Sequence, residues 1–435
     1  MNMTYGNRLK MTITGATHEK EIKVSVSGFP SDTVIDFAEL EAYVARRKPT
    51  AVLGGTPRRE PDKLIIEKGI DKGVTDGGDI VIKVENKDAD STGYPRYDDM
   101  PRPSHADYVS HVKYGQAQTG GGIFSGRRTL AYCIAGGLAA QYLKNKGIEI
   151  YSFITRIGNA SRKGYDFLNP EDLSFLTNGL SPEMLFEIEA ARGRSDSVGG
   201  IIEGIAEGLP VGIGEPIFDG LDARLSEMLF SMPAVKGVEI GKGFGFAEMC
   251  GSSANDSFIF QNERIKTTSN HSGGINGGIS NGMPLVVGVA VKPTPSIGVV
   301  QNTVSLKERE SVALEIKGRH DTCIVPRAAV VVEAVMAFVI LDLMLEGGFI
   351  ARPDNIDGLR KEIDRVDDGL TALAAERKLL AAKIGKLKKR DKLPVEDCLR
   401  EKAVIGRLAE KSKLEKEDIE KLYGALFEIS KKAQE

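Results

Sequence analysis

Histidines, arginines and glycine-rich loops are the features of this sequence best suited to chemistry. A histidine in a loop can act as a general acid or base near neutral pH, and a structural, hydrogen-bonded side chain is an equally good interpretation of any single one. His105, Asp107 and His111 would suit part of a metal site, but no further ligand has a suitable spacing, so we expect no metal. The five histidines are His18, His105, His111, His271 and His320.

The arginines suggest an anion site. Paired arginines occur in ARRKPT and TPRREPD, and single ones stand at Arg127, Arg319 and Arg327. The guanidinium fork binds carboxylate and phosphate, although paired arginines are equally typical of a solvated surface. Glycine-rich loops at residues 119–129 and 270–282 permit turns or a close approach of a ligand to the backbone. Neither loop is a P-loop, and G-x-G-x-x-G is absent.

Both strands and helices must position these residues. Apolar residues that alternate with polar ones predict strands at residues 21–28, 79–86, 148–158 and 285–293. Helical periodicity predicts helices at residues 129–147, 181–193, 219–232 and 328–346. This mixture lacks a regular β-α-β alternation and indicates an α+β fold. The last helix approaches membrane-spanning length, but Glu333 and Asp342 interrupt it, so we expect a buried helix and no membrane.

The composition changes near residue 351. Residues 352–435 hold 39 of the 119 charged residues and five of the 49 glycines, against 80 and 44 in the preceding part. We therefore predict domains at residues 1–350 and 355–435 and a linker at 351–354. The net charge of −3 gives no reason to expect nucleic-acid binding. Four well-separated cysteines and an N-terminus without a signal peptide predict a cytoplasmic protein that has no disulfide framework or zinc.

Nine motifs in the first domain resemble chorismate synthase and follow the order of that family. They are RPSHADY, GGGIFSGR, DSVGG, PVGIGEPIFDGLDA, PAVKGVEIG, GSSAND, SNHSGGINGGISNG, KPTPSI and KGRHDTCIVPRA. The resemblance implies the family's fold, with helices layered between β-sheets, and its homotetramer. It also implies elimination of phosphate from 5-enolpyruvylshikimate 3-phosphate to give chorismate, which requires reduced FMN without net redox change. Whether the protein reduces its flavin with NADPH is left open.

The same resemblance implies roles for single residues. His18 matches the acid toward the departing phosphate, His105 the residue that protonates reduced flavin, and Asp321 the aspartate that helps to remove the C6 proton. Arg47 and Arg127 match basic residues of the substrate or cofactor site. Ser125 counts both as catalytic and as FMN-binding. The other FMN-binding positions are Ala234, Gly277, Lys292, Pro293, Thr294, Pro295, Ser296 and Arg319.

Six positions depart from the family's pattern, at Ala16, Thr17, Glu19, Leu53, Ser104 and Ile123. Ala16 and Glu19 stand close to His18, and Glu19 adds a negative charge beside a histidine expected to handle phosphate. Leu53 replaces an arginine between the two basic clusters, and Ile123 is unusual in the glycine-rich loop. These departures bear on the strength of substrate and phosphate binding more than on the reaction.

The second domain opens with a long amphipathic helix whose apolar stripe contains Arg377. Its stripe positions recur at alternating steps of three and four, which predicts a partner helix. A guanidinium in such a seam needs an anion, and Lys388 follows about three turns later on nearly the same face. The stripe consists of Ile356, Leu359, Ile363, Val366, Leu370, Leu373, Arg377, Leu380, Ile384 and Leu387.

This pattern resembles the all-helical, three-helix chorismate mutases over residues 355–435. The resemblance implies rearrangement of chorismate to prephenate without a cofactor. Arg360 and Arg377 match the clamps for substrate carboxylates, and Lys388 and Gln434 match groups that face the ether oxygen. The two arginines lie about 100° apart around one helix, which fits the family's helix-swapped dimer. Ring and hydroxyl contacts match Asp397, Arg400, Glu401 and Ser430.

We therefore predict a bifunctional enzyme of aromatic amino-acid biosynthesis, in which the product of the first site is the substrate of the second. One alternative is a monofunctional synthase whose helical tail only assembles subunits. Another is a degenerate synthase that serves as the regulatory partner of an active mutase. A homotetramer or a homodimer is expected, and channelling and feedback control are left open.

Overall fold

The computed structural model describes residues 3–17, 19–50, 54–55, 61–86, 95–165, 179–261, 263–316, 318, 320–350, 356–412 and 414–434. Two compact units make up the chain, Met1–Arg352 and Pro353–Glu435. The predicted linker at residues 351–354 lies outside the described residues, as do His18, Leu53 and Arg319.

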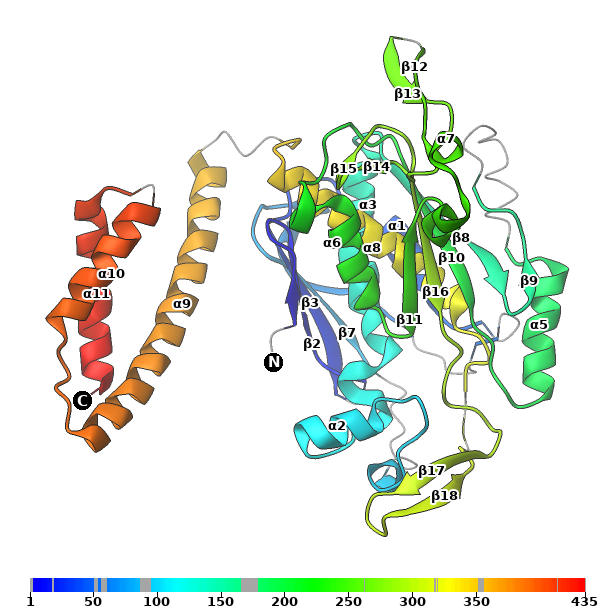
Figure 1. Cartoon of the computed structure of the whole chain (residues 1–435), viewed down its shortest axis with the longest axis horizontal. Coiled ribbons are helices and arrows are strands. Elements are labelled where there is room, and N and C mark those ends of the chain that lie inside the picture. Colours follow the sequence, from blue (N-terminus) through cyan, green and yellow to red (C-terminus); the bar gives the residue numbers. More distant parts are fainter. Residues whose placement is uncertain are drawn as a thin grey trace. The chain divides into compact units, whose positions relative to one another are not determined.

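An antiparallel sheet with the strand order β1-β2-β3-β7-β4 forms one layer of the first unit (Figure 1). In β3, Ile22, Val24 and Val26 are buried and their neighbours are partly exposed, so one face of the sheet lies on the core. The strands predicted at residues 21–28 and 79–86 are confirmed. The strands are β1 (Thr4–Tyr5), β2 (Lys10–Thr14), β3 (Glu21–Ser27), β4 (Ile65–Lys68) and β7 (Ile80–Glu85).

A second antiparallel sheet has the order β11-β16-β10-β8-β9. It confirms the strands predicted at residues 148–158 and 285–293. Periodicity does not predict the central strand β10, because Gly200 and Gly204 break its alternation. A Cβ at Gly204 would lie 2.4 Å from Met336 Sδ, so this glycine permits a helix to pack closely on the sheet. The strands are β8 (Glu149–Ile157), β9 (Ala160–Ser161), β10 (Gly200–Glu207), β11 (Val235–Ile240) and β16 (Leu285–Val291).

Helices fill the space between the two sheets (Figure 1). Helix α3 packs against β3 and α8, and α8 packs against β8 and β10. A Cβ at Gly136 of α3 would lie 2.2 Å from the carbonyl oxygen of Ala334, so this glycine lets α3 and α8 approach closely. These four helices are α1 (Phe37–Ala45), α3 (Thr129–Lys144), α6 (Leu221–Phe230) and α8 (Val325–Glu346).

Helix α8 is long and apolar enough to cross a membrane, but 83% of its most apolar window is buried in the first unit. The two acidic residues that interrupt its apolar run, Glu333 and Asp342, have partners. Glu333 forms an ion pair with Arg46. Asp342 accepts hydrogen bonds from the backbone N–H groups of residues 7–9 and forms an ion pair with Arg224. The prediction of a buried helix is therefore confirmed.

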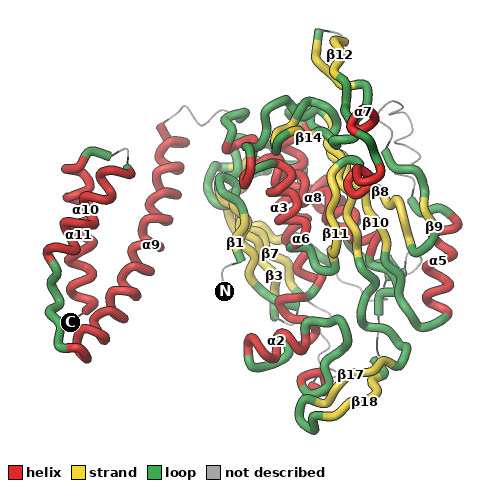
Figure 2. The backbone as a smooth tube through the Cα atoms, viewed as in Figure 1, coloured by secondary structure: helices red, strands yellow, loops and turns green. Residues whose placement is uncertain are grey.

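Short elements surround this core (Figure 2). Helix α5 confirms the helix predicted at residues 181–193. The short elements are β5 (Ile70–Asp71), β6 (Val74–Thr75), α2 (Asp107–Tyr114), the 3-10 turns η3 (Thr119–Phe124) and η4 (Gly126–Arg128), α5 (Pro182–Gly193), α7 (Gly251–Ala254), β12 (Phe258–Gln261), β13 (Arg264–Thr267), β14 (Ile275–Asn276), β15 (Ile279–Ser280), β17 (Gln301–Ser305) and β18 (Glu310–Leu314).

The second unit consists of α9 (Ile356–Asp391), α10 (Cys398–Lys411) and α11 (Lys416–Gln434), with α11 in contact with both other helices. Helix α9 turns its small residues toward α11, because Ala381 is buried and a Cβ at Gly385 would lie 2.6 Å from Gln434 Cα. Within this unit, the apolar stripe members whose side chains the structure describes are exposed. They are Ile363, Val366, Leu370, Leu373, Leu380, Ile384 and Leu387.

Candidate functional site

His105 lies in the turn before α2 and contacts the loop that follows β16. Its Nε2 is 2.9 Å from Ser296 Oγ, and Lys292 Nζ donates a 2.8 Å hydrogen bond to the carbonyl of Ser104. Burial, followed by the positive charge of Arg102, lowers the pKa of His105 from 6.5 to about 4. The imidazole is therefore neutral near pH 7 and can donate or accept one hydrogen bond according to its tautomer.

Asp321 lies beside the same loop. Thr294 Oγ1 donates to the backbone carbonyl of Asp321 over 2.6 Å, and Asp321 Oδ2 accepts a 2.8 Å hydrogen bond from Arg327 Nη1. Arg327 stands in the first turn of α8, and its Nε donates to the carbonyl of Arg47 over 3.1 Å. The structure therefore brings His105, Asp321 and Arg47 together through one loop and the start of one helix.

Two buried arginines share the carboxylate of Asp62. Arg47 Nη2 lies 3.2 Å from Asp62 Oδ2, and Arg127 Nη1 lies 2.5 Å from Asp62 Oδ1. Burial, followed by the positive charge of Arg327, lowers the pKa of Arg47 to about 10. Among the residues that the structure describes, Arg47 Nε is buried without a hydrogen-bond partner. A buried guanidinium N–H of this kind suits an anion.

Asn86 connects this cluster to the loop before β3. Its Oδ1 accepts from Arg127 Nε at 3.2 Å, and its Nδ2 donates to the carbonyls of Ala16 at 3.1 Å and Glu19 at 2.8 Å. Ala16 and Glu19 stand on either side of His18 in the sequence, but His18 itself lies outside the described residues. The amide therefore ties the segment around His18 to the guanidinium of Arg127.

Ser125 belongs to the same cluster because its Oγ accepts the backbone N–H of Arg127 over 3.2 Å. Thr17 Oγ1 donates to the carbonyl of Gly122 over 3.4 Å, so the glycine-rich loop at residues 119–129 also contacts the segment before His18.

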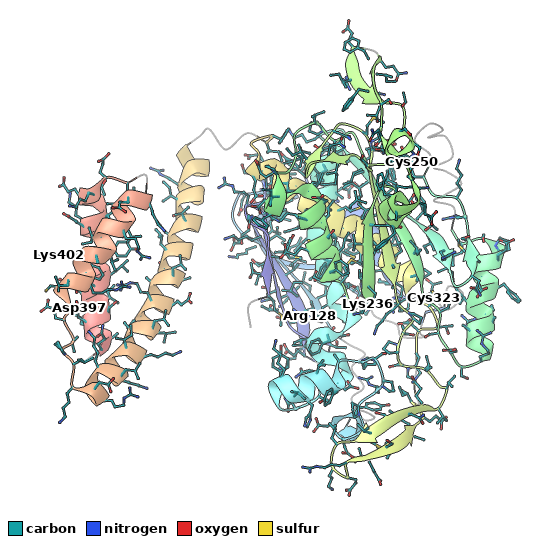
Figure 3. All side chains as sticks on the ribbon, in the orientation of Figure 1. Arg128, Lys236, Cys250, Cys323, Asp397 and Lys402 are labelled. Carbon is teal, nitrogen blue, oxygen red and sulfur yellow. The ribbon has the colours of Figure 1, made fainter. Side chains whose placement is uncertain are left out.

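Figure 3 labels Arg128, which follows Arg127 in the chain, and Lys236 of β11. Both lie away from Cys250 in the first unit.

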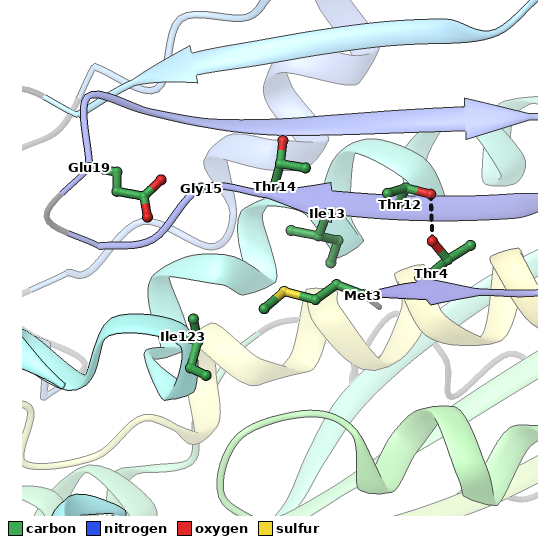
Figure 4. A pocket seen from close by; sticks show the side chains of 8 residues that line it. All are labelled: Met3, Thr4, Thr12, Ile13, Thr14, Gly15, Glu19 and Ile123. Carbon is green, nitrogen blue, oxygen red and sulfur yellow. Dashed lines mark hydrogen bonds between the residues drawn. The ribbon is translucent and has the colours of Figure 1, made fainter. Parts of the chain in front are cut away.

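A cavity of about 270 Å³ lies next to the glycine-rich loop at residues 119–129 (Figure 4). Two of the positions that depart from the family's pattern, Glu19 and Ile123, line it. Among the described residues of its wall there is no candidate catalytic residue. The lining residues are Met3, Thr4, Thr12, Ile13, Thr14, Gly15, Glu19 and Ile123.

Apart from Ser125, the described residues predicted to bind FMN fall at two places. Ala234 has φ +73° and accepts the backbone N–H of Lys292 over 2.9 Å, so it adjoins the loop after β16. Gly277 belongs to the turn between β14 and β15, which adjoins the start of β16 through the bond from Val286 N to the carbonyl of Gly273. The seven residues of β16 span roughly 20 Å, so one chain does not bring Gly277 to the loop after this strand.

Three other histidines have structural partners. His111 Nδ1 lies 3.2 Å from Asp98 Oδ1, and His271 Nδ1 lies 3.1 Å from the carbonyl of Ala254. His320 Nε2 lies 3.2 Å from the carbonyl of residue 316. For these three, the structural interpretation agrees with the contacts.

Asp62 and Asn86 are the members of this cluster that the sequence did not single out. Asp62 stands among several charged residues in TPRREPD, and Asn86 follows directly after β7, where a polar residue is ordinary. Only the folded backbone marks Asp62 as unusual, because its φ is +48°. The sequence contains Arg327 among the arginines of a potential anion site, but its contacts with Asp321 and Arg47 depend on the fold.

In the second unit, Arg377 points from α9 toward α11. Its Nη1 donates to the carbonyl of Leu426 over 2.8 Å and to Ser430 Oγ, and its guanidinium lies 5.3 Å from the ring centre of Phe427. The side chain is therefore held between two helices. Its partners are neutral, so its positive charge is available to an anion.

Lys388 lies in the last turn of α9, and Gln434 lies at the end of α11. Lys388 Nζ donates to the carbonyl of Val395 over 2.8 Å. Gln434 packs against Gly385, and its Oε1 is buried without a hydrogen-bond partner among the described residues. A buried amide oxygen without a partner suggests that a ligand or a reoriented side chain completes the site.

The remaining predicted mutase residues divide into two groups. Asp397 caps α10 by accepting the N–H of Arg400 over 2.9 Å, and Glu401 forms a 3.1 Å ion pair with Lys431 of α11. Arg360 is exposed on α9, roughly 25 Å along the helix from Arg377. A single chain therefore does not bring Arg360 to the other residues.

Comparisons with known proteins match the two units separately. A family model described as chorismate synthase matches residues 9–345, and one described as chorismate mutase type II matches residues 359–435. A chorismate synthase of Dehalococcoides mccartyi is 42% identical over 360 residues, which is 81% of this chain and 99% of that protein. One of Methanobrevibacter smithii is 41% identical over 364 residues, which is 82% of this chain and all of that protein.

A solved structure gives the same result for the fold. A crystal structure of chorismate synthase aligns with a TM-score of 0.63 and 26% identity, over 83% of this chain and 98% of that one.

Proposed function

We propose that this chain, which belongs to the chorismate synthase family and carries a type II chorismate mutase domain at residues 359–435, catalyses two consecutive reactions. The first unit eliminates phosphate from 5-enolpyruvylshikimate 3-phosphate to give chorismate. The second unit rearranges chorismate to prephenate. The observation that carries the first assignment is the buried cluster of Arg47, Arg127 and Asp62. In this cluster, Nε of Arg47 has no hydrogen-bond partner among the described residues.

In the first unit, we infer that Arg47 and Arg127 bind the anionic groups of the substrate. As the C–O bond to phosphate breaks, both of its electrons leave with the phosphate, and a proton donor or cation stabilises that charge. His18 is the proposed donor, and the bonds of Asn86 to the residues on either side of it support this role. Asp321, oriented by Arg327, is proposed to assist removal of the C6 proton.

Reduced FMN, the cofactor expected of this family, fits the donors around the loop after β16. The ammonium group of Lys292 suits a phosphate, and the hydroxyl groups of Thr294 and Ser296, with the neutral ring of His105, suit the polar edge of a flavin. When bound, reduced FMN supplies an electron-rich ring that eases departure of the phosphate. We propose that Ala234 and residues 292–296 hold it. Ser125, Gly277 and Arg319 stay predicted contacts.

The synthase proposal is tested by supplying 5-enolpyruvylshikimate 3-phosphate and chemically reduced FMN to the full chain without oxygen. We expect equal amounts of phosphate and chorismate to form. Absence of phosphate release would support the degenerate synthase instead.

In the second unit, we propose that the reaction needs a clamp and no nucleophile. Arg377 would hold a substrate carboxylate, and Lys388 with Gln434 would face the ether oxygen as negative charge develops there. Gln434 would use its Nε2 amide group for this, because the amide nitrogen is the donor of that side chain, and its packing against Gly385 of α9 supports the assignment. Supplying chorismate without flavin tests the proposal. Failure to form prephenate would favour a tail that only assembles subunits.

We also propose that the second unit pairs with a second copy through α9. The exposed stripe that includes Ile363, Leu370 and Leu373 is unlike the surface of a stable monomer. Pairing of two α9 helices would cover it, and it would allow Arg360 of one copy to reach the site around Arg377 of the other. Solution mass at several protein concentrations tests this pairing.

A further inference from the structure

We propose that Asp62 is a positioning residue of the first site, which rests on the synthase function proposed above. Its carboxylate sets the distance and orientation between the two guanidinium groups that receive the phosphorylated substrate. Asp62 itself touches neither the substrate nor the cofactor in this role. It acts through Arg47 and Arg127.

The contacts of Asp62 use both of its carboxylate oxygens. Oδ2 accepts from Arg47 and Oδ1 from Arg127, so a single planar group fixes one Nη atom of each arginine. The exposed fractions are 6% for Asp62, 2% for Arg47 and 7% for Arg127. All three charges are therefore shielded from water, where an ion pair is strong and the loss of one partner is costly.

The charge balance explains why a carboxylate is needed there. Arg327 lies near Arg47 and helps to lower its pKa, so three guanidinium groups crowd one region. Asp62 and Asp321 supply two negative charges against these three positive charges. Among the residues that the structure describes, the positive charges of this cluster outnumber the negative ones, and the carboxylate of Asp62 offsets the repulsion between Arg47 and Arg127 when no anion is bound.

The backbone at Asp62 makes a precise substitution available. Its φ is +48°, in the left-handed region, which Asp and Asn adopt more readily than other non-glycine residues. Asn therefore fits the same backbone and nearly the same volume. It removes the charge and leaves only one oxygen to accept from two arginines.

The test compares Asp62→Asn with the parent in the full chain. Phosphate release is measured with varied substrate and with varied reduced FMN, and prephenate formation is followed as an internal control. Asp32→Asn is the matched control, because Asp32 also has positive φ, at 56°, but is exposed. We expect the KM for 5-enolpyruvylshikimate 3-phosphate to rise about 100-fold, which is the scale of misplaced binding groups, while the KM for FMN changes less than about twofold.

A merely structural role would raise the KM for 5-enolpyruvylshikimate 3-phosphate and the KM for FMN together, and that outcome would overturn the inference. An Asp62→Asn variant as active as the parent would also overturn it. If the parent itself releases no phosphate, the proposed synthase function fails first.

A double-mutant cycle keeps the inference testable if Asp62→Asn folds poorly. Arg47→Met and Arg47→Met/Asp62→Asn are added, because the double variant removes an opposite pair of charges together. If Asp62 acts through Arg47, the step from Arg47→Met to the double variant costs much less than the roughly 100-fold expected of Asp62→Asn in the parent, and this comparison does not use the Asp62→Asn single variant. A further loss of about 100-fold from Arg47→Met to the double variant would overturn the inference.

Discussion

The two units build their candidate sites in opposite ways. In the first unit, hydrogen bonds within one chain connect His105, Asp321, Arg47, Arg127 and Asn86, and a core of helices between two sheets supports them. In the second unit, three helices leave the apolar stripe of α9 exposed and Arg360 far from Arg377. The core of one chain therefore preorganises the first site, whereas the second site, on the pairing proposed above, would need two chains.

The largest expected effect comes from removing the clamp of the second site. Arg377→Ala should lower kcat/KM for chorismate about 10³-fold, because the fixed cation proposed to hold a substrate carboxylate is lost. Phosphate release by the first unit should stay unchanged, and both activities are measured on the same preparation. Arg390→Ala is the control, because Arg390 is exposed and pairs only with its neighbour Asp391 among the described contacts. Equal loss in both variants would argue against a specific clamp.

The next effect tests whether association builds the second site. Leu373→Glu places a charge on the exposed stripe and should lower mutase activity roughly 100-fold at micromolar protein, because a paired interface would have to bury it. Synthase activity should survive. Leu379→Glu, on the same helix but outside the stripe, should have little effect. Sedimentation measured in parallel should show the loss of pairing, and a variant that stays paired and active would contradict the role of the stripe.

Sequence patterns predict the elements of the first unit better than its site. Alternation identifies β3, β7, β8 and β16, and helical periodicity identifies α3 and α8, because one face of each must be buried. The contacts of Asp62 and Asn86 do not follow from any such pattern. Residues 47, 62, 86 and 127 come together only because separate loops meet at one end of the folded unit, and short-range periodicity carries no information about that meeting.

In the second unit the helix is predicted well and its orientation less well. The stripe correctly predicts that α9 is long and amphipathic. It also places Arg377 within the seam, whereas the structure turns Arg377 toward α11 together with Ala381 and Gly385. Small residues allow α11 to approach, and a pattern based on large apolar residues does not detect them.

A smaller effect separates the units by pH. The folded-state pKa of His105, about 4, lies below its ordinary value of 6.5, so the unfolded chain binds more protons between these pH values. The contribution of His105 to the free energy of unfolding should therefore be fully present above pH 6.5. It should fall as the pH decreases toward 4, and the fall is limited to about 2 kcal/mol because the group is partly exposed.

His105→Gln should remove this contribution from the pH dependence, as measured by hydrogen exchange of β16 peptides in the full chain. Exchange from α11 in the second unit should not respond to the substitution. His111→Gln provides a second control, because the His111 side chain is 39% exposed. An unchanged pH dependence in His105→Gln would show that burial of this imidazole does not govern the stability of the region.

The smallest effect distinguishes a structural from a binding role at one residue of the second site. Asp397 accepts the N–H of Arg400 as the N-cap of α10, and it is also a predicted substrate contact. Asp397→Ala should lower the stability of the second unit by about 1 kcal/mol, whereas Asp397→Asn should change it by only a few tenths, because Asn caps a helix as well as Asp does. Urea unfolding followed by helical circular dichroism, together with mutase assays, checks both variants.

If Asp397→Asn keeps both stability and activity, the contribution of Asp397 is the helix cap alone. If it keeps stability but loses activity, the carboxylate also serves the substrate, and this unit then combines folding and binding in one side chain where the first unit separates them between Asp62 and its arginines.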